Sequence, residues 1–83
     1  MAGKSAKRGR GFGPLEADVM DAVWAAGAPV SVREVMERLN DGRPEPLAYT
    51  TFMTVMSRLA EKDALARRPV GRGYVYEIGR AHV

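Results

Sequence analysis

The chain has 83 residues, with 13 basic and 10 acidic side chains, one histidine, no cysteine and a net charge of +3. This length allows one small domain with a single hydrophobic core. A disulfide framework and a thiolate metal site are excluded, the lone His82 cannot hold a metal, and no run approaches the roughly 20 apolar residues of a membrane span or resembles a signal peptide. We therefore expect a cytoplasmic protein without cofactor or metal.

The charges are distributed unevenly along the chain. Segment 1–13 holds four basic side chains and no acidic one, and because it has almost nothing to bury we expect a disordered basic tail. Segment 16–57 is net acidic, and the chain turns basic again from Arg58 onward. This asymmetry suits a molecule that turns one side toward a polyanion, although the tail alone could equally be a solubilising segment.

A first helix is predicted from Pro14 to about Ala26. Proline suits the first helical position, and Gly27 followed by Ala28-Pro29 ends the helix. We expect Trp24 to be a core residue, since a lone tryptophan on an apolar helix face is usually buried. The apolar stripe comprises Leu15, Val19, Val23 and Ala26, widened by Met20 and Trp24.

A second helix is predicted to begin after Ser31 and to end at Asn40-Asp41-Gly42. Ser31 and Glu34 have the spacing of a capping box, in which each side chain bonds the other residue's backbone amide. The two prolines of the following loop, Pro44 and Pro46, prevent the helix from continuing. The side chains expected to face inward are Val32, Val35, Met36 and Leu39.

A third helix is predicted from about Ala48 to Lys62, with no side chain at its start that could cap the amides. Its apolar stripe is Phe52, Val55, Met56 and Leu59. Its other side carries short hydroxyls and one guanidinium, on Thr50, Thr51, Thr54, Ser57 and Arg58. Because these side chains are short, such a helix face can approach another molecule closely, and its hydroxyl and guanidinium groups can bond phosphates and base edges. This helix is therefore predicted to enter a DNA groove.

After Leu65 the pattern changes to two strands around the tight turn Gly71-Arg72-Gly73. Pro69 places its strand at a sheet edge. Three helices and a basic hairpin predict a mainly α fold with a small β hairpin, a winged helix-turn-helix over residues 14–78.

If Arg58, Arg67, Arg68 and Arg72 each neutralise a phosphate, the log–log salt slope of DNA binding is about −3.6, at about 0.9 per phosphate.

Each of these residues also has a structural interpretation. Thr51 and Thr54 could bond carbonyls of the preceding turn, and Arg58 could pair with Glu61 or Asp63. Arg67 and Arg68 could be solvated charges on an edge strand, and Tyr74 and Tyr76 could pack within the hairpin rather than stack on bases.

Other functions remain as alternatives. The main one is a winged helix that docks a protein and binds no DNA. It would expose aromatic or aliphatic side chains on the third helix, where we expect them all to point inward. RNA binding is disfavoured because the sequence predicts no exposed row of aromatic side chains. Enzymatic activity is disfavoured because the sequence has no nucleophile beside a base, no carboxylate pair and no phosphate-binding loop.

Several motifs resemble one family. They are Leu15-Glu16-x-x-Val19-Met20-x-x-x-Trp24, Val32-Arg33-Glu34-Val35, Ala48-Tyr49-Thr50-Thr51-Phe52-Met53-Thr54-Val55-Met56-x-Arg58-Leu59 and, after the glycine-flanked turn, Tyr74-x-Tyr76. Together they resemble the penicillinase repressor family of the BlaI, MecI and CopY type, over residues 14 to about 78.

The resemblance implies a dimeric bacterial transcriptional repressor. Its third helix would enter the major groove of a palindromic operator in double-stranded DNA, and its wing would lie on the backbone. It further implies release either by a partnered sensor protease, in a β-lactam-responsive branch, or by metal. The DNA-binding residues implied are Tyr49, Thr50, Thr51, Met53, Thr54, Arg58, Arg67, Arg68 and Arg72.

Two departures from the family pattern matter. Some relatives carry charged side chains at the positions of Thr50 and Met53, so their operators do not predict this one. We expect the family's C-terminal dimerisation region to be missing, and residues 79–83 to be a non-family end from a truncated reading frame.

Overall fold

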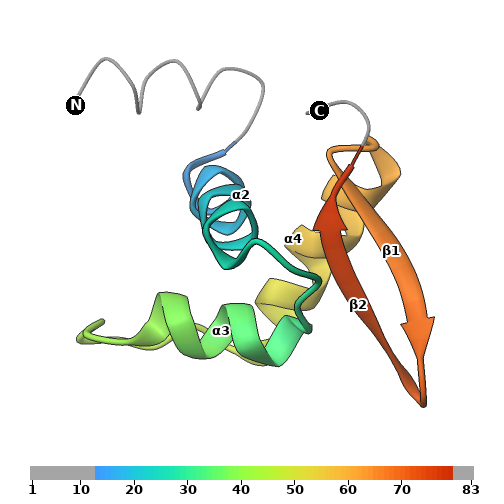
Figure 1. The fold of residues 1–83 in the computed structure, drawn as a ribbon. Helices are drawn as coiled ribbons and strands as arrows, with labels where there is room; N and C mark the ends of the chain where they lie inside the picture. The colour runs from blue at the N-terminus through green and yellow to red at the C-terminus, as the bar shows by residue number, and fades with distance from the viewer. Residues whose placement is uncertain (1–12, 80–83) are drawn as a thin grey trace.

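The computed structural model describes residues 13–79. Three helices, α2 (Pro14–Ala26), α3 (Val32–Asn40) and α4 (Tyr49–Glu61), precede the strands β1 (Leu65–Val70) and β2 (Gly73–Ile78) (Figure 1). This order confirms the predicted winged helix-turn-helix. The expectations for the tail 1–12 and the end 80–83 lie outside the described residues. None of the helices within residues 13–79 is long and apolar enough to cross a membrane.

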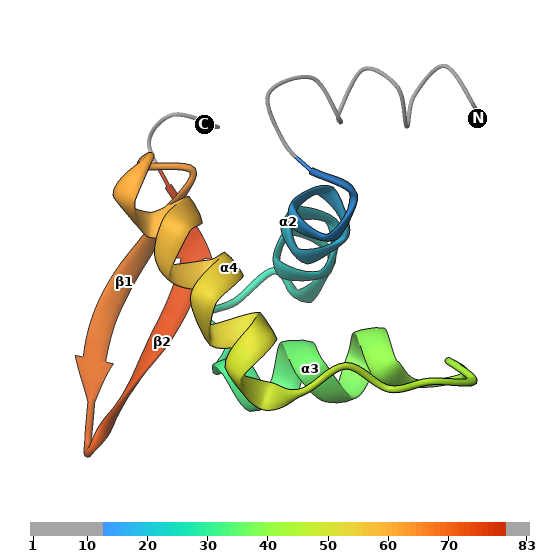
Figure 2. The ribbon, with the colours of Figure 1, turned by 180° about the vertical axis from the view of Figure 1, so that it is seen from behind.

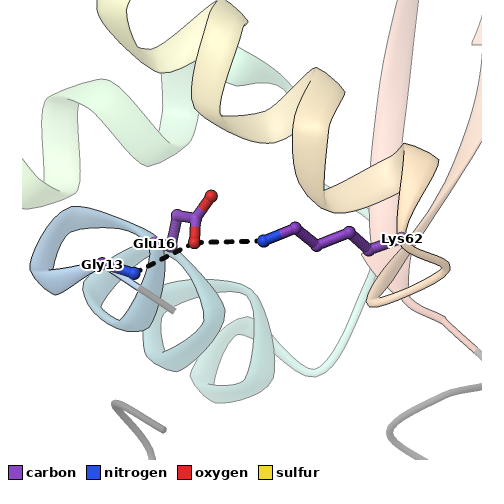
Figure 3. A network of polar contacts seen from close by, with 3 residues as sticks. All are labelled: Gly13, Glu16 and Lys62. Carbon is purple, nitrogen blue, oxygen red and sulfur yellow. Dashed lines mark hydrogen bonds and ion pairs between the residues drawn. The ribbon is translucent and has the colours of Figure 1, made fainter. Parts of the chain in front are cut away.

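Helix α2 is tied at its start to the end of α4. The backbone N–H of Gly13, the N-cap residue, donates to Oε1 of Glu16 over 3.0 Å. The same oxygen lies 3.5 Å from Nζ of Lys62 (Figure 3). One carboxylate therefore satisfies a free amide of α2 and anchors the residue that follows α4.

The capping box predicted for α3 is present. The N–H of Glu34 donates to Oγ of Ser31 over 3.1 Å, and the N–H of Ser31 donates to Oε1 of Glu34 over 2.7 Å. Two amides that a helix start leaves without partners are thereby satisfied. The sequence alone is sufficient to place this helix start.

Asn40, the last residue of α3, holds the chain just before α4. Its Nδ2 donates to the carbonyl oxygen of Leu47, and the N–H of Leu47 donates to its Oδ1, both over 2.9 Å. The side-chain amide thus binds both polar groups of Leu47, as a neighbouring strand would. This contact closes loop 41–46 and sets the point from which α4 starts.

The hairpin is antiparallel, with Val70 opposite Gly73 and Leu65 opposite Ile78. Val30, between α2 and α3, pairs with Tyr76 on the other side of β2, through N···O distances of 2.9 and 2.7 Å. β1 is therefore an outer strand, as the proline at position 69 predicts. The hairpin tip projects beyond the helices (Figures 1 and 2).

The core lies where the three helices meet the base of the hairpin. Phe52, Met56 and Leu59 of α4 are fully buried at its centre, so the predicted apolar stripe of this helix is confirmed. Burying one flank of α4 leaves its opposite flank outward. The remaining buried side chains are Val19, Met20, Ala22, Val23, Val32, Val35, Ala64, Leu65 and Tyr76.

Trp24 is exposed, contrary to the prediction that it belongs to the core. Its exposed fraction is 66%, whereas that of Met20, one turn earlier, is 6%. Because four residues advance about 40° beyond a full turn, Trp24 lies further round α2 than Met20. That rotation takes the indole past the edge of the buried stripe, whose centre is formed by Val19 and Val23.

Candidate nucleic-acid interface

The outward flank of α4 carries two parallel rows of side chains spaced four residues apart. Thr50, Thr54 and Arg58 form one row and are all exposed. Tyr49 and Met53 begin the other and are 47% and 44% exposed. Seen from behind the view of Figure 1, α4 lies in front of the other elements, and no helix or strand covers it (Figure 2).

The start of α4 leaves amides free. The N-cap residue of α4, Ala48, makes no side-chain cap, as predicted, and the first turn of the helix holds no acidic residue. The carbonyl oxygen of Ala48 accepts hydrogen bonds from the backbone N–H groups of Thr51 and Phe52. The backbone N–H groups of Tyr49 and Thr50 have no acceptor within residues 13–79. Free amides at the positive end of a helix dipole favour an anion such as a phosphate.

The hydroxyl groups on this flank are also free. Thr50 and Thr54 are exposed, and neither hydroxyl bonds another described group. Thr51 is half-buried at the edge of the flank, and it does not bond the preceding turn through its hydroxyl either. The structure therefore does not show the alternative in which the hydroxyls of Thr51 and Thr54 bond carbonyl groups of the preceding turn.

Arg58 stands at the far end of the threonine row. It is exposed, and it pairs neither with Glu61 and Asp63 nor with any other acidic side chain in the described part of the chain. The helix thus presents free amides at one end, hydroxyls along its middle and a guanidinium in its last turn.

The wing arginines do not act as one group. Arg67 lies opposite Tyr76 and Arg68 opposite Val75, so the two side chains leave opposite faces of the hairpin. The guanidinium carbon of Arg67 lies 4.8 Å from the ring centroid of Tyr74, and Nη2 of Arg68 lies 3.1 Å from Oε1 of Glu77. Arg72 is exposed in the turn, without an ion pair in residues 13–79. The sequence brings these residues to one hairpin but not to one face.

Two exposed side chains contradict an expectation from the sequence. The aromatic and aliphatic side chains of α4 do not all point inward, because Tyr49 and Met53 lie on its open flank. They are on the turns before and beside the threonines rather than in the buried stripe. Tyr49 and Met53 lie three residues before the buried Phe52 and Met56, a spacing that places them at the edge of the buried stripe.

The hollows described in residues 13–79 lie away from α4. Three shallow hollows in the described chain are lined by α2, α3, the loop between them and the end of β2, and none includes a residue of α4. Small-molecule sites are usually concave, so the open flank of α4 suits a groove in a larger partner.

Comparison with known proteins agrees with this geometry. The family model described as penicillinase repressor matches residues 12–79. The transcriptional regulators BlaI of two Mycobacterium tuberculosis strains, CDC 1551 / Oshkosh and ATCC 25618 / H37Rv, are each 44% identical over 65 residues, or 78% of this chain and 46% of each relative. The chain thus spans about half the length of these relatives. It belongs to the penicillinase repressor family, a family of transcriptional regulators and not of enzymes.

Proposed function

We propose that this domain binds double-stranded DNA and represses transcription in the bacterial cytoplasm. Helix α4 lies in the major groove with its open flank toward the bases, and the hairpin lies on the phosphate backbone. The observation that carries the proposal is that open flank, where Thr50, Thr54 and Arg58 lie exposed and where no acidic residue occurs from Pro46 to Ala60. The relatives named as transcriptional regulators support the same function.

The operator would be palindromic and bound by a homodimer. A single module of this size covers about 600–1,000 Å² of DNA, and pairing two modules gives specific repressors their larger interface. Two half-sites would then lie about 34 Å apart, or a multiple of that. The dimerisation region would belong to the part of the relatives that this chain does not span.

Induction would follow the family's two routes, a β-lactam signal relayed by a sensor protease or a metal signal. The family's description as penicillinase repressor favours the β-lactam route. Whichever signal induces release, the residues that we propose to bind DNA are the same. They are Tyr49, Thr50, Thr51, Met53, Thr54, Arg58, Arg67, Arg68 and Arg72.

A charge placed on the open flank tests the DNA-binding role. Thr54→Glu puts a carboxylate against the phosphates and base edges, and we expect binding to a duplex to weaken at least about tenfold because like charges repel. Ala25→Glu is the matched control, since it adds the same charge at an exposed helical position of α2. Fluorescence anisotropy with a labelled duplex measures both variants, and circular dichroism verifies their folding.

The outcome separates DNA binding from a general effect of net charge. Equal weakening by the two variants would contradict a groove contact at Thr54. The unmodified chain is expected to bind with an affinity that falls as salt rises, and binding without any salt dependence would contradict phosphate contacts.

Protein docking is the second candidate function, because Tyr49 and Met53 are exposed on α4. Aromatic and methionine side chains are enriched at protein interfaces. The adjacent free amides, hydroxyls and unpaired Arg58 favour DNA instead. A chain that fails to bind DNA at low salt would reverse this choice.

A further inference from the structure

The first two turns of α4 lack every side chain that reads a purine through two hydrogen bonds. Between Leu47 and Ser57 there is no arginine, lysine, asparagine, glutamine, aspartate or glutamate. Guanine is usually read by arginine or lysine and adenine by asparagine or glutamine. The start of a recognition helix contacts the base edges, so this helix must read them with other groups.

Two kinds of side chain are available on the open flank in these first two turns of α4, before Arg58. The first is the hydroxyls of Thr50 and Thr54, which accept from or donate to any base and discriminate little. The second is apolar surface, from Met53 with an exposed fraction of 44% and Tyr49 with 47%. The major groove offers one apolar feature, the 5-methyl group of thymine.

Resting on the proposed DNA-binding function, we propose that Met53 packs against thymine 5-methyl groups in the operator half-site and sets its base preference. Tyr49 lies one turn before Met53 on the same row and extends the apolar surface toward the start of the helix. A thioether on three rotatable bonds adapts to the position of a methyl group. The helix therefore recognises thymine by its methyl group rather than by paired hydrogen bonds.

The surroundings of Met53 favour DNA over a protein partner. Met53 is flanked by the exposed hydroxyls of Thr50 and Thr54, and the same flank ends in the unpaired Arg58. A protein interface with a buried core would place free hydroxyls at its polar rim rather than on both sides of an apolar centre. In a groove, these polar groups meet base edges and phosphates while Met53 meets a methyl group.

Uracil substitution tests the proposal, because uracil differs from thymine only in lacking the methyl group. Duplexes that the 83-residue chain prefers are first selected from a library with a randomised central segment. Each thymine of the preferred half-site is then replaced singly by uracil, and affinities are measured by anisotropy for the unmodified chain, Met53→Ala and Met53→Leu. Circular dichroism verifies the folding of both variants.

The expected result is a loss of about fourfold at one or more thymines, the effect of removing one buried methyl group. Met53→Leu should keep this difference and Met53→Ala should abolish it. Binding that is salt-dependent but indifferent to every uracil would overturn the methyl contact and leave the proposed function standing. A thymine preference that persists in Met53→Ala would overturn the role of Met53. An absence of DNA binding would overturn both proposals.

Discussion

Gly79 lies where the chain leaves β2 and passes the turn after α4. It is buried, and its N–H donates to the carbonyl of Ala64 over 2.9 Å. A Cβ at this position would lie 2.3 Å from the carbonyl oxygen of Asp63 and 2.9 Å from the carbonyl carbon of Leu65. These are backbone atoms of a tight turn, so they cannot rotate aside as a side chain would. Gly79, expected from the sequence to belong to a non-family end, is thus packed into the domain.

Replacing Gly79 with alanine should therefore destabilise the fold. We expect Gly79→Ala to lower the free energy of unfolding by about 1–3 kcal/mol, the usual cost of forcing extra volume into a packed site. Gly73→Ala is the control, because an added Cβ there meets nothing within 4 Å. Its effect should stay within about 0.5 kcal/mol. Urea denaturation of both variants provides the comparison, and equal losses would contradict the close approach at Gly79.

At the level of helices, local spacing predicted burial well except at one position. The stripe of α4 and the capping box of α3 depend only on residues three or four apart, and both are present. The position of Trp24 depends on where the neighbouring elements stop covering α2. Residue type suggested burial, but the rotation of Trp24 past Met20 takes it beyond the core.

A pair of truncations measures this difference between α2 and α4. Phe52→Ala removes a fully buried ring of α4 and should cost about 3–5 kcal/mol of unfolding free energy. Trp24→Ala removes a larger but exposed ring and should cost less than about 1 kcal/mol. Chemical denaturation followed by circular dichroism measures both without relying on the tryptophan. A loss at Trp24 as large as that at Phe52 would show that the indole is covered in solution.

In the hairpin too, contacts between residues near in sequence could be predicted, whereas contacts between distant residues could not. Its two-residue turn sets the register, and strand alternation then places Arg67 and Arg68 on opposite faces, so this split could be predicted from the sequence. The pairing of Val30 with Tyr76 could not, because it joins residues far apart in the chain. The same holds for the contact between Glu16 and Lys62.

Across residues 13–79, Arg58 of α4 and Arg72 of the wing have no ion pair, and neither do Arg38 of α3 and Arg43 of the loop that follows it. The acidic side chains are concentrated on α2 and α3. Six of the seven acidic residues between Glu16 and Ser57 lie on those two helices or directly after α3. This concentration of acidic residues was visible in the charge pattern of the sequence. Which arginines are free was not, since it depends on the partners of Arg67 and Arg68.

The salt dependence of DNA binding should report which arginines are free. Arg72→Ala should reduce the magnitude of the log–log slope by about 0.9, the value for one lost phosphate contact. Arg68→Ala should reduce it by less, because Arg68 must first leave Glu77, which lies 3.1 Å away. Arg33→Ala, on α3 beside Glu37, is the control and should leave the slope unchanged. Anisotropy titrations at several salt concentrations give the slopes, and differences between variants cancel any contribution from the tail.

Two results would contradict this assignment of free charges. A change in slope for Arg33→Ala as large as that for Arg72→Ala would indicate that α3 also contacts phosphates. A full loss of about 0.9 for Arg68→Ala would indicate that its pair with Glu77 opens at no measurable cost.

The amide of Asn40 has a practical consequence for engineering. Asn40 makes two hydrogen bonds with Leu47, directly before α4, and the intervening residues 41–46 are exposed. We therefore expect the Asn40 contact, rather than loop 41–46, to determine where α4 begins. Inserts at Glu45, such as an epitope or a dye-bearing cysteine, should be accommodated without shifting the recognition surface. Loop 41–46 thus offers an attachment site near the flank of α4 that we propose to bind DNA.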